Sequence, residues 1–215
     1  MSASRRAALL EFARAHRAVI IEDDYDSEFR LDGRPLDALQ VLDRDGCVFY
    51  VGTFAKSMFN AMRVGFAVTP PWARQALVAA KQAVDGSNPM LVQDALAAFI
   101  SEGHLARHVR KMRRVYGERH AALLRALDRH CKGRLRPFPS LAGVHLAAEL
   151  AVDMMALDVA AAAAEDGITV ETLDRYAFGK CAPNGLVFGY GMIEAKDIDP
   201  AIRKLSRVMD RLADA

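Results

Sequence analysis

A lysine, an arginine and two hydroxyl residues follow one short apolar run of this sequence. The run at 48–51 is followed by Thr53, Lys56, Ser57 and Arg63. An amine can form a Schiff base with an aldehyde, whereas hydroxyl and guanidinium groups are suited to binding a phosphate. This spacing indicates a lysine that could hold a phosphorylated ligand.

A second polar cluster follows the apolar run at 18–21 and contains Glu22, Asp23, Asp24 and Tyr25. In open α/β sheets, ligands lie beyond the carboxyl ends of the strands. If the two runs are neighbouring parallel strands, an acid, a phenol and an amine meet at one edge. Taken singly, each group is more commonly a solvated surface residue, so the hypothesis depends on their combination.

These groups correspond to what a protein supplies to pyridoxal phosphate. That cofactor requires an amine for its aldehyde, an anion facing its ring nitrogen, a donor to its ring oxygen, and hydroxyl and cationic groups for its phosphate. A carboxylate near the ring nitrogen favours the protonated ring. Side chains alternate along a strand, so only one of the adjacent acids Asp23 and Asp24 can point toward such a ligand.

The elements that must position these residues predict an α/β fold. Apolar periodicity predicts helices at 5–16, 71–85, 88–130 (broken or bent at Gly103), 155–165, and from Asp199-Pro200 to the end. Continuous apolar runs predict strands at 18–21, 47–51, 64–68, 143–150, 168–173 and 185–191. The segment 131–140 is basic, contains proline and is interpreted as a connector.

Composition excludes several classes of protein. The 215 residues are 52% hydrophobic and 26% charged with a net charge of +2, which gives no bulk reason to expect nucleic-acid or membrane binding. The three cysteines are far apart, which argues against a disulfide framework and favours the cytoplasm. His104 and His108 lack an evident third ligand, so no metal site is predicted.

Three longer stretches resemble a known family. They are IIEDDYDSEFRLDGRPLDAL, VGTFAKSMFNAMRVGF and EGHLARHVRKMRRVYGERHAALL. They resemble the aminotransferase-like domain of the MocR-type regulators, a branch of the GntR family of bacterial transcription factors. That domain has the fold of the class I, fold-type I, pyridoxal-phosphate-dependent aminotransferases. The resemblance covers nearly the whole chain.

The resemblance implies roles for particular residues. Lys56 is the residue that attaches covalently to pyridoxal 5'-phosphate, with Asp23 at the ring nitrogen and Tyr25 at the ring oxygen. Thr53 and Arg63 bind the phosphate. In the motif TLDRYAFG, Arg175 matches the arginine that binds an amino acid's carboxylate.

The chain also departs from the family pattern. Ala55 stands where the family usually has serine, and Asn60 replaces a usual proline in the loop before Arg63. The family's winged helix, glycine-containing phosphate loop and ring-stacking aromatic have no counterpart here. We therefore expect a C-terminal fragment, with a partial cofactor-binding large domain at 1–135 and a small α+β domain at 136–215.

The resulting hypothesis is the effector domain of a transcriptional regulator. The family implies an amino acid or amine effector, a homodimer, and DNA binding only through a separate N-terminal module. Enzymatic activity is left open, with weak or absent activity expected for this chain; the main alternative is a free-standing class I/II aminotransferase. A remote alternative is a phosphatase of the haloacid-dehalogenase type, with Asp24 as nucleophile, Asp26 as acid/base, Thr53 at the phosphate and a magnesium ion.

Overall fold

The computed structural model divides the chain into two compact units, each described by itself below. The first contains 1–28 and 33–109, and the second contains 29–32 and 110–215. The division between the two units falls within a long helix, between residues 109 and 110. The domain boundary predicted between residues 135 and 136 stays a prediction. The structure describes residues 1–25, 27–30, 37–86, 89–140, 142–151, 154–177 and 183–214.

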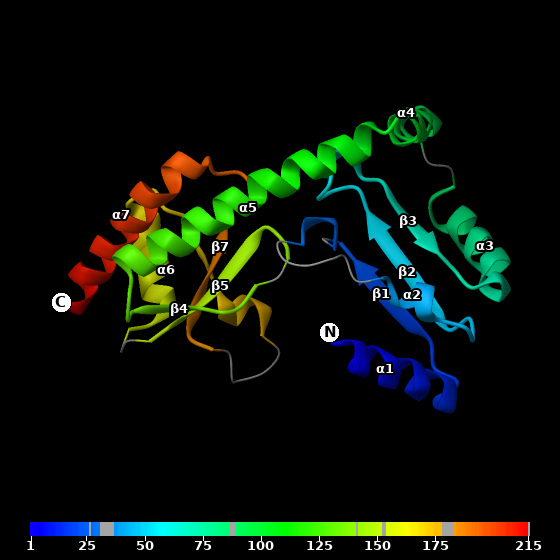
Figure 1. Ribbon diagram of the computed structural model, residues 1–215, viewed down its shortest axis with the longest axis horizontal. Coiled ribbons are helices and arrows are strands. Elements are labelled where there is room, and N and C mark those ends of the chain that lie inside the picture. The colour runs from blue at the N-terminus through cyan, green and yellow to red at the C-terminus, as the bar shows by residue number, and fades with distance from the viewer. Residues whose placement is uncertain are drawn as a thin grey trace. The chain divides into compact units, whose positions relative to one another are not determined.

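The first unit contains a three-stranded sheet in the order β1-β2-β3 (Figure 1). Strand β1 (Ile20–Asp24) is parallel to β2 (Val48–Thr53), and β2 is antiparallel to β3 (Gly65–Val68). The predicted strand runs are therefore confirmed as neighbours. Because β1 and β2 are parallel, their carboxyl ends lie at the same edge of the sheet.

Four helices accompany this sheet: α1 (Ala3–His16), α2 (Leu39–Leu42), α3 (Arg74–Asp85) and α4 (Met90–Ser101). Helix α1 begins earlier than predicted, because the Ser2 hydroxyl accepts the Arg5 amide at 3.4 Å. Helices α3 and α4 bury almost none of their side chains; only Leu96 of α4 is buried.

Glu22 joins three elements of the first unit. Its carboxylate accepts the backbone N–H groups of Leu39 at 2.7 Å and Gln40 at 3.1 Å, at the start of α2. It also pairs with Arg6 of α1 at 3.3 Å. This half-buried carboxylate therefore fixes α1 and α2 to one face of β1 and has a structural task.

The longest helix is α5 (His104–His130), which follows Gly103 at φ +74°. The predicted break at Gly103 is confirmed, because a positive φ is a conformation that glycine adopts readily and that ends a helix. In the second unit, the buried side chains of α5 are Tyr116, Leu123, Ala126 and Leu127, so one stripe of the helix faces the core.

The second unit has a four-stranded antiparallel sheet in the order β4-β5-β7-β6. The strands are β4 (Leu135–Pro137), β5 (His145–Leu150), β6 (Glu171–Thr172) and β7 (Gly185–Gly189). The connector interpretation of 131–140 is wrong in part, because three of its residues pair with β5 as an edge strand. The strand predicted at 168–173 is also shorter, since a helical turn begins at Leu173.

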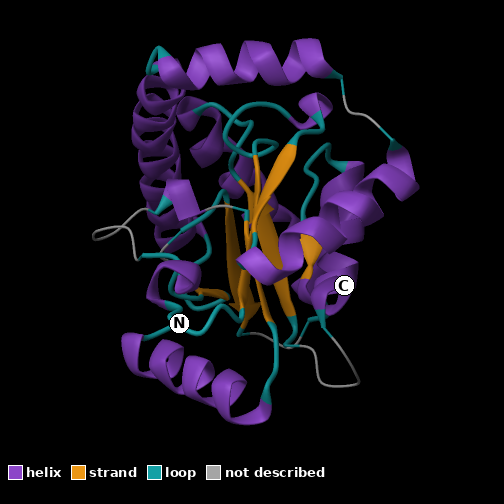
Figure 2. Ribbon diagram, turned by 90° about the vertical axis from the view of Figure 1, so that its right-hand side faces the viewer, coloured by secondary structure: helices purple, strands orange, loops and turns teal. Residues whose placement is uncertain are grey.

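Helices α6 (Ala156–Glu165) and α7 (Ala195–Ala213) complete the second unit. Helix α7 begins before the predicted start at Asp199-Pro200, so Pro200 lies inside the helix. Figure 2 shows that helices make up most of the regular structure. Within the described part of the chain, none of the helices combines the length and the apolar character that a membrane span requires. The buried face of α7 consists of Ile198, Ile202, Leu205, Ser206, Val208 and Met209.

Candidate functional site

The carboxyl ends of β1 and β2 bring the two predicted polar clusters to one edge of the first sheet. Asp23 lies opposite Val51, and Asp24 lies opposite Gly52, immediately before Thr53. Side chains alternate between the faces of a sheet, so Asp23 and Val51 share one face while Asp24 and Gly52 share the other. The alternation thus separates the two adjacent aspartates.

Asp24 has a structural role in the described part of the chain. One carboxylate oxygen accepts the Tyr50 hydroxyl at 2.8 Å, and the other accepts the Ser27 amide at 3.1 Å. Burial raises the pKa of Tyr50, and the hydrogen bond to the Asp24 carboxylate raises this pKa further. Tyr50 is therefore held as a neutral phenol that donates to the Asp24 carboxylate.

Asp23 is exposed and makes no hydrogen bond or ion pair with the other described residues. Tyr25 follows two residues later, with 51% of its surface exposed. A free carboxylate at the end of a strand can face a cationic ring nitrogen of a ligand. Asp23 and Asp24 have the same side chain, so their different hydrogen bonding follows from the opposite faces of the sheet toward which they point.

The loop that carries Lys56 follows β2, and hydrogen bonds fix its start to the end of β2 and to the residue before β3. Thr53 accepts the Ala55 amide through its hydroxyl at 3.1 Å, and the Phe54 amide donates to Val64 at 3.1 Å. Lys56 is exposed, lies in the turn that follows β2, and has no partner among the described residues. Its ammonium is therefore available to a ligand.

Ser57 supports the fit of this loop to a polar ligand. Its side chain is only 2% exposed, yet its hydroxyl oxygen has no hydrogen-bond partner among the described residues. A buried polar atom without a partner costs about 1–3 kcal/mol. Such a group beside an unpaired lysine fits a loop whose polar contacts are completed when a ligand is bound.

Arg63 ends the short helix Asn60–Met62 and precedes β3. Its side chain is exposed, and Nη1 donates to the Asn60 side-chain oxygen at 3.4 Å. It makes no ion pair with a described residue. The first unit therefore presents Asp23, Tyr25, Thr53, Lys56 and Arg63 on β1, β2 and the loops that directly follow them.

Arg175 lies in the second unit, on the helical turn Leu173–Tyr176. Its guanidinium is exposed and pairs with Glu171 at 3.4 Å, and the Tyr176 hydroxyl also donates to Glu171. The role of Arg175 as a substrate contact stays a prediction from the family motif. The last residues of its motif, Phe178 and Gly179, lie outside the described residues.

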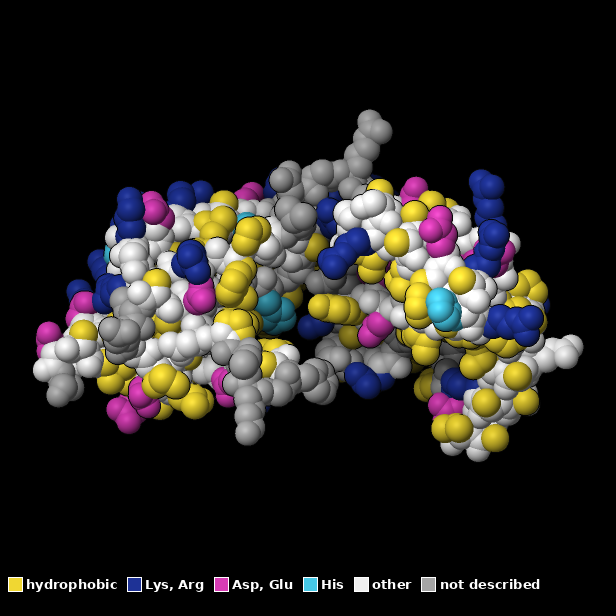
Figure 3. Space-filling view, turned by 90° about the horizontal axis from the view of Figure 1, so that it is seen from below, with side chains coloured by type: hydrophobic (Ala, Val, Ile, Leu, Met, Phe, Trp, Pro, Cys, Tyr) yellow, Lys and Arg dark blue, Asp and Glu magenta, His cyan; other side chains and the backbone are white. Residues whose placement is uncertain are grey.

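An apolar groove of about 490 Å³ borders the lysine loop. It lies between the 58–62 segment and α4, so it adjoins the candidate site without containing a predicted residue. On the face of the molecule drawn in Figure 3, hydrophobic side chains lie between the charged ones. The groove is lined by Met58, Phe59, Ala61, Met62, Leu91, Val92, Ala95, Leu96 and Phe99.

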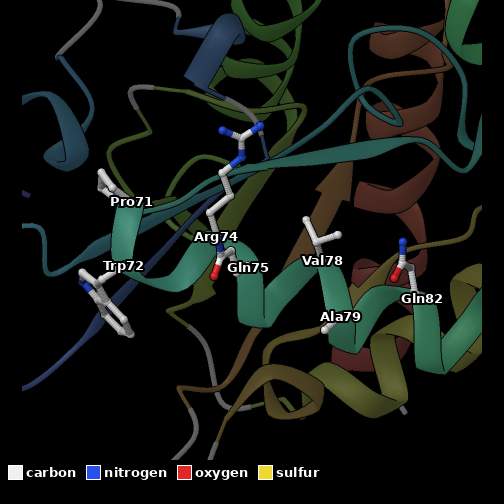
Figure 4. A pocket seen from close by; sticks show the side chains of 7 residues that line it. All are labelled: Pro71, Trp72, Arg74, Gln75, Val78, Ala79 and Gln82. Carbon is white, nitrogen blue, oxygen red and sulfur yellow. The ribbon is translucent and has the colours of Figure 1, made fainter.

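A larger hollow of about 740 Å³ lies along α3 and the turn before it (Figure 4), and none of the predicted site residues lines it. Trp72 at its start donates to the Gly46 carbonyl at 2.8 Å and contacts Phe49 edge to face. The remaining lining residues all come from the stretch that ends at Gln82. The volume of a hollow therefore does not identify the candidate cofactor site in this chain.

The phosphatase alternative finds little support. The carboxylate of Asp24, its nucleophile, is occupied by the Tyr50 and Ser27 bonds. Asp26, its acid/base, lies outside the described residues. Over the ranges that the structure describes, no group of three or more histidine, cysteine, aspartate or glutamate residues could hold a metal ion.

Comparison with known proteins places this geometry in context. No protein-family model matches the chain. The chain is 38% identical over 203 residues to the probable rhizopine catabolism regulatory protein MocR of Rhizobium meliloti, a match that covers 93% of the chain and 41% of the relative. It is 33% identical over 205 residues to the HTH-type transcriptional regulator YhdI of Bacillus subtilis, with coverages of 95% and 44%.

A solved structure gives the same result for the fold. The α-aminoadipate aminotransferase LysN from Thermus thermophilus, complexed with N-(5'-phosphopyridoxyl)-L-leucine, superposes with a TM-score of 0.87 at 30% identity. The match covers 97% of this chain and 54% of that enzyme. The chain thus spans about half the length of the enzyme and less than half the length of the two regulators.

By its fold the chain is therefore an α/β domain of the fold-type I aminotransferase class. Within that class, its sequence places it with the aminotransferase-like part of the MocR-type regulators of the GntR family, as predicted. The cofactor of this class, pyridoxal 5'-phosphate, is represented in the matched enzyme by its phosphopyridoxyl ligand.

Sequence reasoning missed three residues around the site: Ser57 as a buried hydroxyl, Asn60 as the partner of Arg63, and Glu171 as the partner of Arg175. Glu171 and Arg175 are four apart, a spacing that could have suggested a pair. Asn60 was identified only as the replacement of a usual proline, and nothing in the sequence indicated its contact with Arg63. No sequence signal indicates the burial of the Ser57 hydroxyl.

Proposed function

We propose that this chain is a pyridoxal-phosphate-binding, effector-sensing domain in which Lys56 attaches to the cofactor. The proposal is carried by two exposed groups, Lys56 and Asp23, that have no partner among the described residues and lie at the carboxyl ends of two parallel neighbouring strands. Lysine ammonium groups and carboxylates at the surface are usually solvated, but here they follow the carboxyl ends of strands, where α/β folds bind ligands.

Each residue of the set has a distinct task. Lys56 supplies the amine that bonds to the aldehyde, and Asp23 faces the ring nitrogen and favours its protonated form. Tyr25 donates to the ring oxygen, while Thr53 and Arg63 hold the phosphate. When bound, the protonated ring withdraws electrons from an amino compound attached to it. Arg175 would bind the carboxylate of that compound if it is an amino acid.

The regulatory part of the proposal follows from the relatives. Their names describe transcriptional regulators, so we propose an amino acid or amine as effector, DNA binding through a module outside this chain, and a cytoplasmic location. A homodimer is supported by the apolar groove beside the lysine loop and by the exposed side chains of α4, which a partner copy could bury.

A free-standing aminotransferase is the second candidate, favoured by the similarity to the Thermus enzyme over 97% of the chain. In that case Lys56 would also carry a proton between the substrate and the cofactor. The two candidates differ when the cofactor-loaded chain is mixed with an amino acid. An enzyme converts one amino acid per bound cofactor to the keto acid, whereas an effector domain binds the amino compound without converting it.

The proposal is tested by titrating the full chain with pyridoxal phosphate and following the absorbance band of the lysine-bound cofactor. Wild type is expected to show the band, with a modest affinity, whereas Lys56→Ala is expected to lose it. Lys111→Ala removes a similarly exposed lysine of α5 and is expected to behave as wild type. An unchanged band in Lys56→Ala would overturn the proposal.

A further inference from the structure

The backbone of Arg63 has an uncommon conformation. Its φ and ψ are 51° and 39°, in the left-handed region, although the residue is not glycine. For residues other than glycine this region is unfavourable, because the Cβ atom crowds the backbone. Residues in such conformations are held there by their surroundings and occur often at ligand-binding sites. Contacts around Arg63 must therefore hold its backbone in this conformation.

Both ends of the loop that contains Arg63 are fixed. Thr53 of β2 pairs with Gly65 of β3, and the Phe54 amide donates to the Val64 carbonyl at 3.1 Å. The Arg63 amide closes the preceding helical turn by donating to the Asn60 carbonyl at 3.4 Å. With these ends fixed, the direction of the arginine side chain depends on the turn Asn60–Met62.

Asn60, the first residue of this turn, also contacts the Arg63 side chain. Its side-chain oxygen accepts from Nη1 of Arg63 at 3.4 Å, and both residues are exposed. An amide is neutral, so it can orient the guanidinium without cancelling the charge. The guanidinium has five N–H donors, so one bond to Asn60 leaves several for an anion. An aspartate at this position would instead pair with the arginine and compete with the ligand.

We infer that Asn60 is a positioning residue, which holds the Arg63 guanidinium toward the phosphate of a ligand attached to Lys56. The inference rests on the proposed function and goes beyond it, because it assigns to Asn60 a specific effect on the phosphate end of the ligand. A residue that merely stabilised the turn would affect phosphorylated and unphosphorylated ligands alike. Asn60 is expected to discriminate between them.

The experiment compares pyridoxal phosphate with pyridoxal, which has the same aldehyde and ring but no phosphate. Affinities of the full-length chain for both are measured for wild type, Asn60→Ala and Asn60→Asp, with thermal unfolding of each. Gln93→Ala is the matched control, since Gln93 is an exposed amide on α4 that lines no part of the groove.

Asn60→Ala is expected to weaken pyridoxal phosphate binding by about two- to tenfold and to leave pyridoxal binding unchanged. Asn60→Asp is expected to weaken phosphate-dependent binding more, because its carboxylate neutralises Arg63. Equal losses for both ligands, or no loss in either variant, would overturn the role of Asn60 while leaving the proposed function intact. If wild type attaches neither ligand at Lys56, the proposed function and this inference both fail.

Discussion

At the scale of single residues, the candidate site depends on a difference between two adjacent acids. Asp23 is exposed and unpaired among the described residues, whereas Asp24 accepts from Tyr50 and Ser27. We expect Asp23→Ala to weaken cofactor binding and to shift the bound absorbance band to shorter wavelength, with little loss of stability. Asp24→Ala should instead destabilise the fold by about 1–3 kcal/mol, because it leaves the Tyr50 hydroxyl unpaired.

Cofactor titration and denaturant unfolding of the two variants separate these effects. Asp23→Asn is a matched control of equal size that removes only the charge, and it should follow Asp23→Ala in binding. Equal changes in affinity for the Asp23 and Asp24 variants would contradict the assignment.

His120 predicts a pH dependence of stability in the second unit. Burial lowers the pKa of this imidazole, its Nε2 atom has no partner among the described residues, and its ring lies 5.6 Å from that of Tyr190. The charged form is disfavoured in the folded state relative to the unfolded state. This contribution to stability is therefore complete above the unfolded pKa near 6.5 and decreases as the pH falls below that value.

Denaturant unfolding of wild type between pH 8 and pH 5 should show falling stability at the acid end, and His120→Gln should reduce the slope. His16→Gln, at the exposed end of α1, is the control and should leave the slope in place. An identical slope in wild type and His120→Gln would show that other groups cause the dependence.

At the scale of elements, two glycines should respond oppositely to alanine. A Cβ at Gly52 would lie 2.5 Å from the Phe66 ring, which packs near Tyr50 and Phe54. Gly52→Ala should therefore cost about 1–3 kcal/mol through overpacking. A Cβ at Gly117, inside α5, would meet nothing within 4 Å, so Gly117→Ala should stabilise by about 0.5–1 kcal/mol. Thermal unfolding tests both, and a stabilising Gly52→Ala would mean that the ring moves freely.

The sequence predicted the elements that carry the site, because β1, β2 and β3 are continuous apolar runs bounded by polar residues. It did not predict β4, since Arg136 and Pro137 suit a connector as well as an edge strand. It placed the start of α7 too late because Pro200 resembles a first helical residue. The Asn60–Arg63 contact could not be predicted, because it depends on a left-handed backbone that arginine rarely adopts.

At the scale of the whole molecule, the exposed apolar side chains of α4 predict self-association. Leu91 lines the groove beside the lysine loop and is 84% exposed. If a second copy covers it, Leu91→Lys should weaken the dimer by about tenfold or more, since burying one leucine contributes about 1.5–3 kcal/mol. Sedimentation over a range of concentrations measures this, with Gln93→Lys as the charge-matched control. A wild-type chain that is monomeric throughout would contradict the proposed dimer.

The central claim is that Lys56 binds the cofactor, and the most direct test is to locate the bond. The full chain is incubated with pyridoxal phosphate, reduced with borohydride, digested and analysed by peptide mass spectrometry. The account predicts that the phosphopyridoxyl group is found on the peptide that contains Lys56, and that excess inorganic phosphate reduces the labelling. A stable label on another lysine, with Lys56 unmodified, would contradict it.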